Sequence, residues 1–366
     1  MKKCSTCSKI RLTYAFFDSP SHFFFSKCLA ENTIKVGAVL PLTGVASLAG
    51  KSVEHGLRYF VDRFNNSADN DRLKIELVVE DSQSLNSRAV NGFKKLTKVD
   101  GIGLIFTVFG GHGMALKDLA ERERVILWSF VIHPEQTKNT EFVFRYNMSI
   151  DADVDNVSKF IESIGARKIA VLYSKDEIGT YYNRKIAEVV QILGSSIVSE
   201  GVLVTDSHFK SVIPKLISNS PDIIFLYLFG SNLGLAVKQI REAGYKGRIY
   251  LGPHVLIAPD VIEIAGDKVK GAYFTNIKSS DRCSSELLRT RNSKDEIGFL
   301  SCFAYTSLEL IVQTMKDLGL NGLSLDNTKT LAQRIRSLKT FTGTLDSVYI
   351  KPSGDIEVPV EIGIIK

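Results

Sequence analysis

The sequence has no long apolar run and little charge of one sign. Nowhere do about 18 apolar residues follow one another, so no segment has the usual transmembrane pattern. The formal net charge is +6, and residues 1–30 supply +4 of it through five basic residues against Asp18 alone, which leaves +2 for the remainder. Because no basic stripe is present, the sequence does not support nucleic-acid binding.

The sequence also lacks the short motifs of the common catalytic sites. It contains no P-loop, no G-x-S-x-G, no H-E-x-x-H and no kinase signature set. Asp176–Glu177 and Asp151–Asp153 are candidate pairs of catalytic carboxylates. They stand in polar turns or at predicted helix starts, where carboxylates cap helices or face water. We therefore predict that the protein is not an enzyme and has no cofactor.

Cysteine is scarce, with five in 366 residues. Cys4 and Cys7 have the spacing of a metal or redox pair, but no second pair accompanies them, and we expect no metal site. Only Cys283 and Cys302 follow residue 30. We expect Cys302 to be a buried apolar residue of a helix. The alternative is a disulfide between these two cysteines in an oxidising compartment.

Residues 1–30 have some features of a secretory leader. The start is basic, and Cys28-Leu29-Ala30 offers small residues before a cut at Glu31. Polar residues such as Asp18 interrupt the apolar stretch, and Lys27 is a poor neighbour for a lipid on Cys28. We predict an atypical signal segment, a periplasmic or extracellular location, and no lipid anchor at Cys28.

The rest of the chain alternates between strand and helix patterns. The apolar, β-branched run Ile34–Leu40 predicts a buried strand, and the apolar residues from Val53 to Phe64 recur at helical spacing. Ligands of such sheets bind outside the carboxyl ends of the strands, which is where the intervening loop 43–50 must lie. The loop lacks the G-x-G-x-x-G spacing, so a nucleotide is not implied.

Two such series follow one another in a chain whose length suggests two domains. The first has predicted strands at 34–40, 73–80, 103–108, 125–129 and 142–147. The second has predicted strands at 168–173, 197–202, 222–228, 248–252 and 272–276, with helices at 152–164, 178–193, 209–218, 231–243 and 258–265. Helices at 299–318 and 328–338 precede a closing hairpin. The pattern predicts an α/β protein with two doubly wound, Rossmann-like lobes.

The stretch IKVGAVLPLTG, with GLRYFVDRFN after it, resembles the amino end of the type I periplasmic solute-binding proteins, in their branched-chain amino-acid-binding branch. The resemblance continues to the end of the chain, where Gly343, Leu345, Asp346, Gly354 and Asp355 are similar to the family's closing hairpin. It implies the type I periplasmic-binding-protein fold, whose two lobes are joined by three crossovers.

The resemblance also implies where the chain crosses between lobes. We expect crossings near Met148, Ile277 and Phe341. Lobe 1 would then consist of residues 31–147 and 278–340, and lobe 2 of residues 148–277 and 341–366.

The function implied by the resemblance is that of an extracytoplasmic receptor. Such a protein captures a small polar or anionic solute between its lobes, acts as a monomer, and delivers the solute to the permease of an ABC importer at the inner membrane. The alternative is a ligand sensor or partner-binding module on the same scaffold without transport, because a fold alone does not separate the two.

The family's pocket can be carried over position by position. Ala49 stands where a large aromatic is usual, Gly110 where a serine meets the ligand carboxylate, and His254 where a glutamate holds the amino group. Both anchors of an α-amino acid are thus absent, so leucine, isoleucine and valine should bind poorly. The expected ligand-binding residues are Ser47, Leu48, Ala49, Gly110, Gly111, His112, Ser129, His133, Ile178, Phe229 and His254.

Three of these residues are histidines that each follow a predicted strand at its carboxyl end. We expect His112, His133 and His254 to lie near one another in the cleft and to gain charge near pH 6, which would favour an anionic ligand. The glycines of segment 110–113 precede a predicted helix at 114–123, whose first N–H groups could also bind an anion. The alternatives are glycines that allow close packing and histidines that cap loops or face water.

Overall fold

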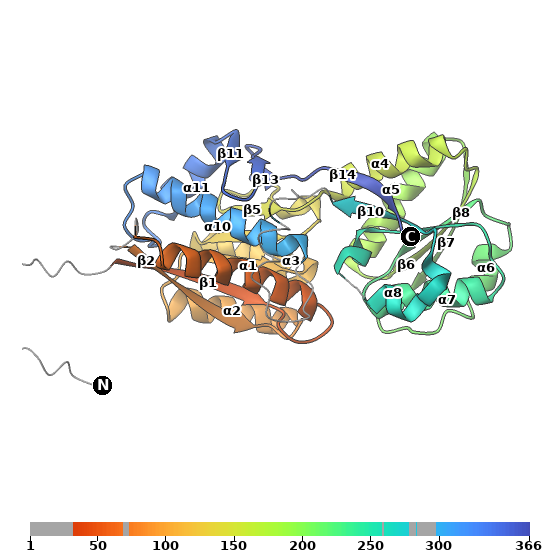
Figure 1. Ribbon diagram of the computed structural model, residues 1–366, viewed down its shortest axis with the longest axis horizontal. Coiled ribbons are helices and arrows are strands. Elements are labelled where there is room, and N and C mark those ends of the chain that lie inside the picture. The colour runs from red at the N-terminus through yellow and green to blue at the C-terminus, as the bar shows by residue number, and fades with distance from the viewer. Residues whose placement is uncertain (1–31, 69–72, 258–259, 278–282, 284–297) are drawn as a thin grey trace, which may run out of the picture. The chain divides into compact units, whose positions relative to one another are not determined.

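The computed structural model describes residues 32–68, 73–257, 260–277, 283 and 298–366. The expected leader, with Cys4, Cys7 and Cys28, lies outside the described residues. In the described part, two six-stranded sheets each carry their own helices, and a two-stranded sheet accompanies the first (Figure 1).

The first sheet has the strand order β13-β5-β4-β3-β1-β2, and all its pairings are parallel. Its strands are β1 (Asn32–Leu40), β2 (Leu73–Asp81), β3 (Leu104–Val108), β4 (Ile126–Phe130), β5 (Val143–Tyr146) and β13 (Asp355–Ile356). The elements grouped with it are α1 (Ser47–Asn65), α2 (Asn86–Lys98), α3 (Gly110–Glu123), η2 (Pro134–Gln136), α10 (Phe299–Asp317), α11 (Thr328–Ser337) and the hairpin of β11 (Thr340–Thr342) and β12 (Ser347–Tyr349).

The second sheet has the order β14-β10-β9-β8-β6-β7, in which only the edge strand β14 runs antiparallel. Its strands are β6 (Lys168–Ser174), β7 (Ser196–Val202), β8 (Ile223–Tyr227), β9 (Arg248–Leu251), β10 (Tyr273–Ile277) and β14 (Val360–Ile364). The helices grouped with it are α4 (Ile150–Ser163), α5 (Glu177–Ile192), α6 (Ile213–Ile217), α7 (Ser231–Glu242), η3 (Pro253–Ile257), α8 (Asp260–Ala265) and η4 (Gly266–Val269).

The five strands that begin each sheet follow the same order. In the first sheet β1 lies between β2 and β3, and in the second sheet β6 lies between β7 and β8. The direction of winding therefore reverses beside β1 and beside β6, which is the doubly wound arrangement. This confirms the predicted fold class of two parallel-sheet α/β lobes.

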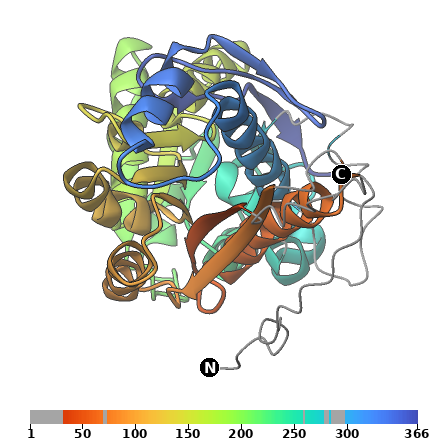
Figure 2. The same ribbon diagram turned by 90° about the vertical axis from the view of Figure 1, so that its left-hand side faces the viewer.

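The central strands have continuous apolar sequences because helices cover both of their faces. Every residue of β3, β4 and β8 is buried. In the first lobe, α1 and α10 lie side by side (Figure 2). A Cβ atom on Gly56 of α1 would fall 2.1 Å from the carbonyl oxygen of Ser301, so only glycine permits this approach of the two backbones. The Ser301 hydroxyl also donates a hydrogen bond to the carbonyl of Ser52 at 2.7 Å.

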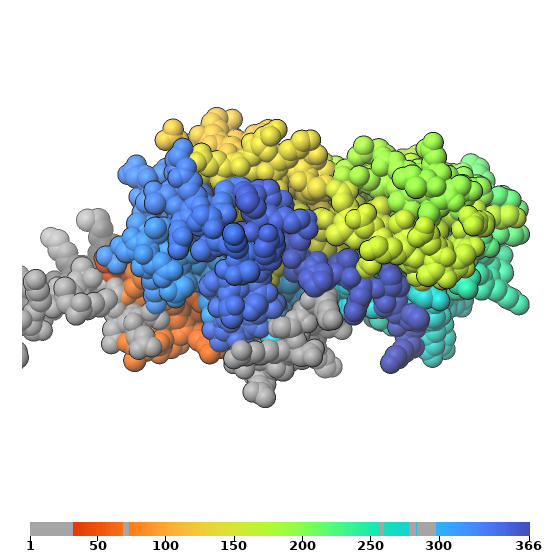
Figure 3. Space-filling model, turned by 90° about the horizontal axis from the view of Figure 1, so that it is seen from above, coloured from red at the N-terminus to blue at the C-terminus, as the bar shows by residue number. Residues whose placement is uncertain are grey.

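The predicted third crossing near Phe341 is wrong. The chain stays with the first lobe through β11 and β12, whose Val348 packs in the core of that lobe, and β13 then pairs with β5. It reaches the second sheet only at β14, which pairs with β10. In Figure 3 the dark blue C-terminal residues pass from the first lobe onto the second. The resemblance implied a third crossing, but two- and three-residue strands carry almost no periodic signal by which the sequence could place it.

Two local predictions also differ from the structure. α3 begins at Gly110 rather than near Met114, because the N–H groups of His112 and Gly113 already bond to the carbonyl of Phe109. α6 is limited to Ile213–Ile217, within a predicted helix of 209–218.

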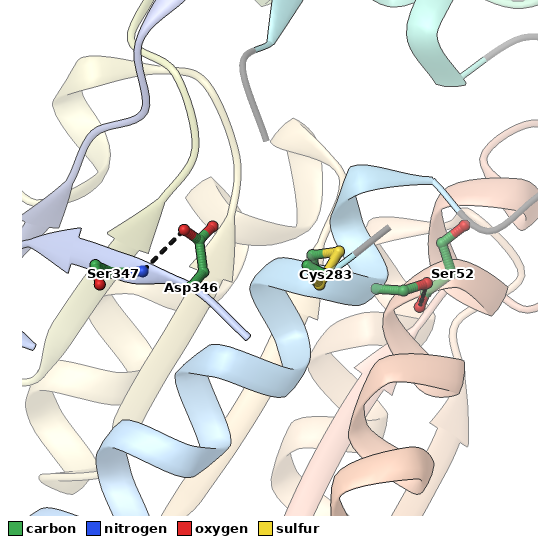
Figure 4. Close-up of a disulfide and its surroundings, with 6 residues drawn as sticks. Ser52, Cys283, Asp346 and Ser347 are labelled. Atoms are coloured by element: carbon green, nitrogen blue, oxygen red, sulfur yellow. Dashed lines mark hydrogen bonds between the residues drawn. A yellow bond between two sulfur atoms is a disulfide. The ribbon is translucent and has the colours of Figure 1, made fainter. Parts of the chain in front are cut away.

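Cys283 and Cys302 form a disulfide, contrary to the expectation of an unpaired Cys302. Both side chains are buried and their Cα atoms are 5.8 Å apart, which suits a bridge. Figure 4 shows the bond at the first turn of α10, with Ser52 of α1 nearby. The sequence could not decide this pairing because it depends on where the fold places residue 283.

Candidate functional site

A cavity of about 680 Å³ lies between the two lobes. Its walls come mainly from the segments at the carboxyl ends of β1, β2, β3 and β4 in the first sheet and of β6, β8 and β9 in the second, together with the start of α10. This is the edge at which doubly wound sheets bind ligands, and the volume is within the range of small-molecule sites.

Six of the eleven predicted site residues line the cavity. They are Ala49, Gly110, Gly111, Ile178, Phe229 and His254. Gly110 and Ile178 face each other across the lobes, since a Cβ atom on Gly110 would lie 3.4 Å from Cγ1 of Ile178. Whether these residues contact a ligand is still a prediction.

The other five predicted residues do not line the cavity. Ser47 and Leu48 are half-buried in the first turn of α1. Ser129 is fully buried, and its hydroxyl accepts a hydrogen bond from the side-chain amide of Gln136 at 3.1 Å. This bond holds the segment after β4 against the strand. His112 and His133 also lie outside the cavity lining.

The predicted cluster of three histidines is wrong. His112 is fully buried, and burial lowers its pKa to about 4, although the backbone of Val108 acts in the opposite direction. His133 lies in a separate depression beside the cavity, where its ring meets Tyr181 of the other lobe with centroids 4.9 Å apart. Only His254 faces the cavity. Side chains that follow neighbouring strands can face the cavity, the core or another part of the surface, and the local sequence pattern does not predict which.

The predicted gain of histidine charge near pH 6 is also not supported, because burial lowers the pKa of all three rings. In His133, Nδ1 accepts a hydrogen bond from the N–H of Glu135 at 3.2 Å, so its proton belongs on Nε2, which lies 3.8 Å from the carboxylate of Glu177. In His254, Nδ1 lies 3.1 Å from the carbonyl oxygen of Leu228. A carbonyl only accepts, so Nδ1 of His254 donates and Nε2 of the neutral ring is an acceptor.

The remaining cavity walls are mainly apolar. Sequence reasoning missed several of these residues, which include Val45, Leu85, Phe109, Phe130, Met148, Val204 and Phe299. Most of them stand at or after strand ends, which was the available signal, whereas Phe299 begins α10. A loop sequence does not say which side chains turn inward. Asp176 and Glu177 also line the cavity, and none of the described lining residues is lysine or arginine.

The carboxylate of Asp176 serves the fold. It caps α5 by accepting the N–H of Gly179 at 2.7 Å, and it accepts the Ser174 hydroxyl at 2.6 Å. This confirms its prediction as a helix-capping group. Asp153, for which a capping or solvated role was expected, lies in the first turn of α4, but its side chain is fully buried.

One carboxylate organises the cavity loops of the first lobe. Asp81, at the end of β2, accepts the N–H groups of Leu42, Thr43 and Gln83 at 2.9, 3.3 and 2.8 Å and the Thr43 hydroxyl at 2.9 Å. Burial acts to raise the pKa of Asp81, but these hydrogen bonds outweigh it and lower the pKa. The Ser84 hydroxyl continues the link by donating to the carbonyl of Thr43 and accepting the N–H of Ala46.

Two classes of site are not found in the described part of the chain. No group of three or more histidine, cysteine or acidic side chains there has the arrangement of a metal site. None of its helices combines the length and hydrophobicity that a membrane span requires.

Comparison with solved structures shows the same fold. A leucine-binding protein from Thermotoga maritima superposes with a TM-score of 0.80 at 21% identity, over 91% of this chain and 95% of that one. A solute-binding protein of an ABC transporter from Rhodopseudomonas palustris, solved with 3,4-dihydroxybenzoic acid, gives 0.79 at 18% identity, over 92% and 94%. Identities this low show the fold and leave the ligand open.

Sequence comparisons point the same way. A leucine-, isoleucine-, valine-, threonine- and alanine-binding protein from Pseudomonas aeruginosa is 24% identical over 334 residues, which cover 88% of this chain and 87% of that protein. Residues 33–357 match the family model described as periplasmic binding protein. The chain therefore belongs to the periplasmic binding protein family.

Proposed function

We propose that this protein is an extracytoplasmic solute-binding protein that encloses a small solute between its lobes and delivers it to the permease of an ABC importer. The observation that carries the proposal is a cavity whose walls come from both sheets. A ligand there contacts both lobes only when they are closed, so binding favours the closed form, which the permease would recognise. Membership of the family supports the transport role.

The proposed solute has an apolar body and one polar end. Apolar side chains form most of the wall, and a neutral His254 offers Nε2 to a hydroxyl or N–H donor. The sequence suggested a small polar or anionic solute, and a solute without an apolar part would leave the apolar side chains of this wall without a matching surface. An anionic end would rely on the first N–H groups of α3, since no described lining residue is a lysine or arginine.

The ligands of two structural neighbours have this general form. A Streptococcus pneumoniae protein with a TM-score of 0.76 holds isoleucine, and the Rhodopseudomonas palustris protein holds 3,4-dihydroxybenzoic acid. Both combine an apolar part with a polar end, so they guide the choice of test compounds.

The disulfide supports the proposed location. Cys283 and Cys302 pair in the folded chain, and such bonds persist in oxidising compartments such as the periplasm. We propose that the chain acts there as a monomer.

Native mass spectrometry of freshly purified protein tests the binding function by detecting a co-purified solute. Small-angle X-ray scattering with and without that solute should then show a smaller radius of gyration in its presence. Uptake of the labelled solute by cells that lack the gene should fall. Binding and closure without any change in uptake would favour the sensor function instead.

A further inference from the structure

Phe109, the residue that begins the α3 turn, has an unusual backbone. Its φ is 85° and its ψ is 123°, a region in which side chains of L-residues are crowded. Glycine would adopt this conformation without strain, and two glycines follow directly. A phenylalanine therefore needs contacts that offset the cost of the strained backbone.

Those contacts form a row of rings that runs from one lobe to the other. The Phe109 ring meets His112 edge-to-face with centroids 5.1 Å apart, and it meets Phe229 with centroids 5.9 Å apart. Phe229 in turn meets His254 at 5.3 Å. All three spacings suit favourable edge-to-face pairs. We call these four residues the aromatic bridge.

The aromatic bridge crosses between the lobes at the wall of the cavity. Phe109 follows β3 of the first sheet, whereas Phe229 follows β8 of the second, and both line the cavity with His254. The pair of Phe109 and Phe229 is thus a direct contact between lobes that requires no ligand. The pair also affects His254. Phe229 packs against the ring of His254, and Nδ1 of that ring is held by the carbonyl of Leu228.

We propose that Phe109 is a positioning residue of the binding site, whose ring holds the two lobes together through Phe229 before a solute arrives and orients His254. The proposal rests on the proposed function only in treating the cavity as the solute site. Loss of one aromatic pair should reduce the closing equilibrium constant of the ligand-free protein about 2- to 10-fold.

The experiment measures closure without any ligand, so its outcome is independent of solute identity and of transport. Wild-type protein is stripped of solute by dialysis in denaturant and refolded with its disulfide intact. Small-angle X-ray scattering then compares the radius of gyration of the wild type with Phe109→Ala, Phe229→Ala and the double variant. Both single variants should be more open, and the double variant should be no more open than either.

Two further variants separate positioning from a loss of general stability. Phe160→Ala is the matched control, because Phe160 contacts Tyr250 and Tyr273 within the second lobe alone. It should lower the melting temperature without changing the radius of gyration. Phe109→Gly removes both the ring and the backbone strain. It should open the lobes as much as Phe109→Ala does, but it should melt at a higher temperature than Phe109→Ala, which keeps the strain.

An unchanged radius of gyration in Phe109→Gly and Phe229→Ala would overturn the proposal, as would equal opening in Phe160→Ala. Should Phe109→Ala fail to fold, the glycine variant and Phe229→Ala still decide the question. A result that overturns the role of Phe109 would leave the proposed closure by solute untouched, because this experiment contains no solute.

Discussion

Arg145 in β5 donates a hydrogen bond from Nε to the carboxylate of Asp355 in β13 at 2.7 Å, although 210 residues separate them. Arg145 is buried, and it also donates to the carbonyl of Met148 at 3.0 Å and to Glu357 at 3.3 Å. The pair thus joins the strand before the first crossing to the strand before the third. Burial acts to raise the pKa of Asp355, but the charge of Arg145 and the hydrogen bonds from Ser353, Thr137 and Arg145 together outweigh it and lower the pKa.

Replacing Asp355 should therefore destabilise the first lobe. Asp355→Asn leaves the buried guanidinium with the more distant Glu357 as its carboxylate partner, and breaking a buried pair costs about 3 kcal/mol. Urea denaturation at pH 7 measures the loss. Glu357→Gln is the control, because its side chain is 28% exposed and should cost far less. Equal effects of the two variants would argue against the pair as the main link.

The same pair sets a dependence of stability on acid. The pKa of Asp355 is lowered in the folded state, so its stabilisation is present above the unfolded value of 3.8 and is lost as pH falls below it. Asp355→Asn should flatten this part of the acid-unfolding curve. A parallel curve in the variant would contradict the assignment.

Asp153 should produce the opposite dependence in the second lobe. Burial raises its pKa to about 6, against hydrogen bonds from Thr275 at 2.6 Å and Tyr182 at 2.8 Å and a weaker one from Tyr250. The folded state therefore retains a proton that the unfolded state has released, so stability should fall as pH rises from about 4 to about 6. The total change is on the order of 3 kcal/mol.

Asp153→Asn tests this directly. The amide keeps the size of the side chain and does not titrate. The fall in the free energy of unfolding between pH 4 and 6 that is due to Asp153 should therefore disappear. Urea denaturation at several pH values, followed by circular dichroism, is the measurement. The idea is wrong if the slope persists in the asparagine variant. Asp222→Asn, at a half-buried site with a lowered pKa, is a control that should leave the slope between pH 4 and 6 intact.

The disulfide should contribute to stability. Cys283 and Cys302 close a loop with a sequence separation of 19, for which the chain-entropy model gives about 3 kcal/mol. The Cys283→Ser, Cys302→Ser double variant should melt at a lower temperature than the wild type. Adding a reductant should lower the melting temperature of the wild type alone. Identical melting of both proteins in oxidising buffer would contradict the prediction.

Leucine, isoleucine and valine should bind poorly to the wild-type protein. By resemblance, Gly110 and His254 replace the serine and the glutamate that hold an α-amino acid, and both residues line the cavity. Each hydrogen bond to a charged group contributes about 1.5–3 kcal/mol, so the loss of both weakens binding by orders of magnitude. Low-micromolar binding of any of the three by calorimetry would refute this.

A gain-of-function variant gives the matched control. A Cβ atom on Gly110 would meet Ile178 at an ordinary 3.4 Å, so the position accepts a Cβ atom without a clash. The Gly110→Ser, His254→Glu double variant should bind the three amino acids more tightly than the wild type. No improvement would show that these two positions do not decide the selectivity.

The sequence by itself determined the α/β class, the two series of strands and helices, and the loops at which the cavity lies. Local periodicity encodes these features, because residues such as Val53 and Leu57 repeat at the spacing of a helix that covers a sheet. The resemblance to the family, carried over position by position, added Ala49, Gly110, Ile178, Phe229 and His254, all of which line the cavity.

Only the tertiary structure decided which strands pair and which side chains turn inward. The two-residue strand β13 joins β5 through contacts between residues far apart in the chain, and no local pattern reports such a pairing. The same holds for the disulfide and for the burial of His112. The inward turn of Phe109 depends on a strained backbone that is held by rings of both lobes, so neighbouring residues in the sequence do not specify it.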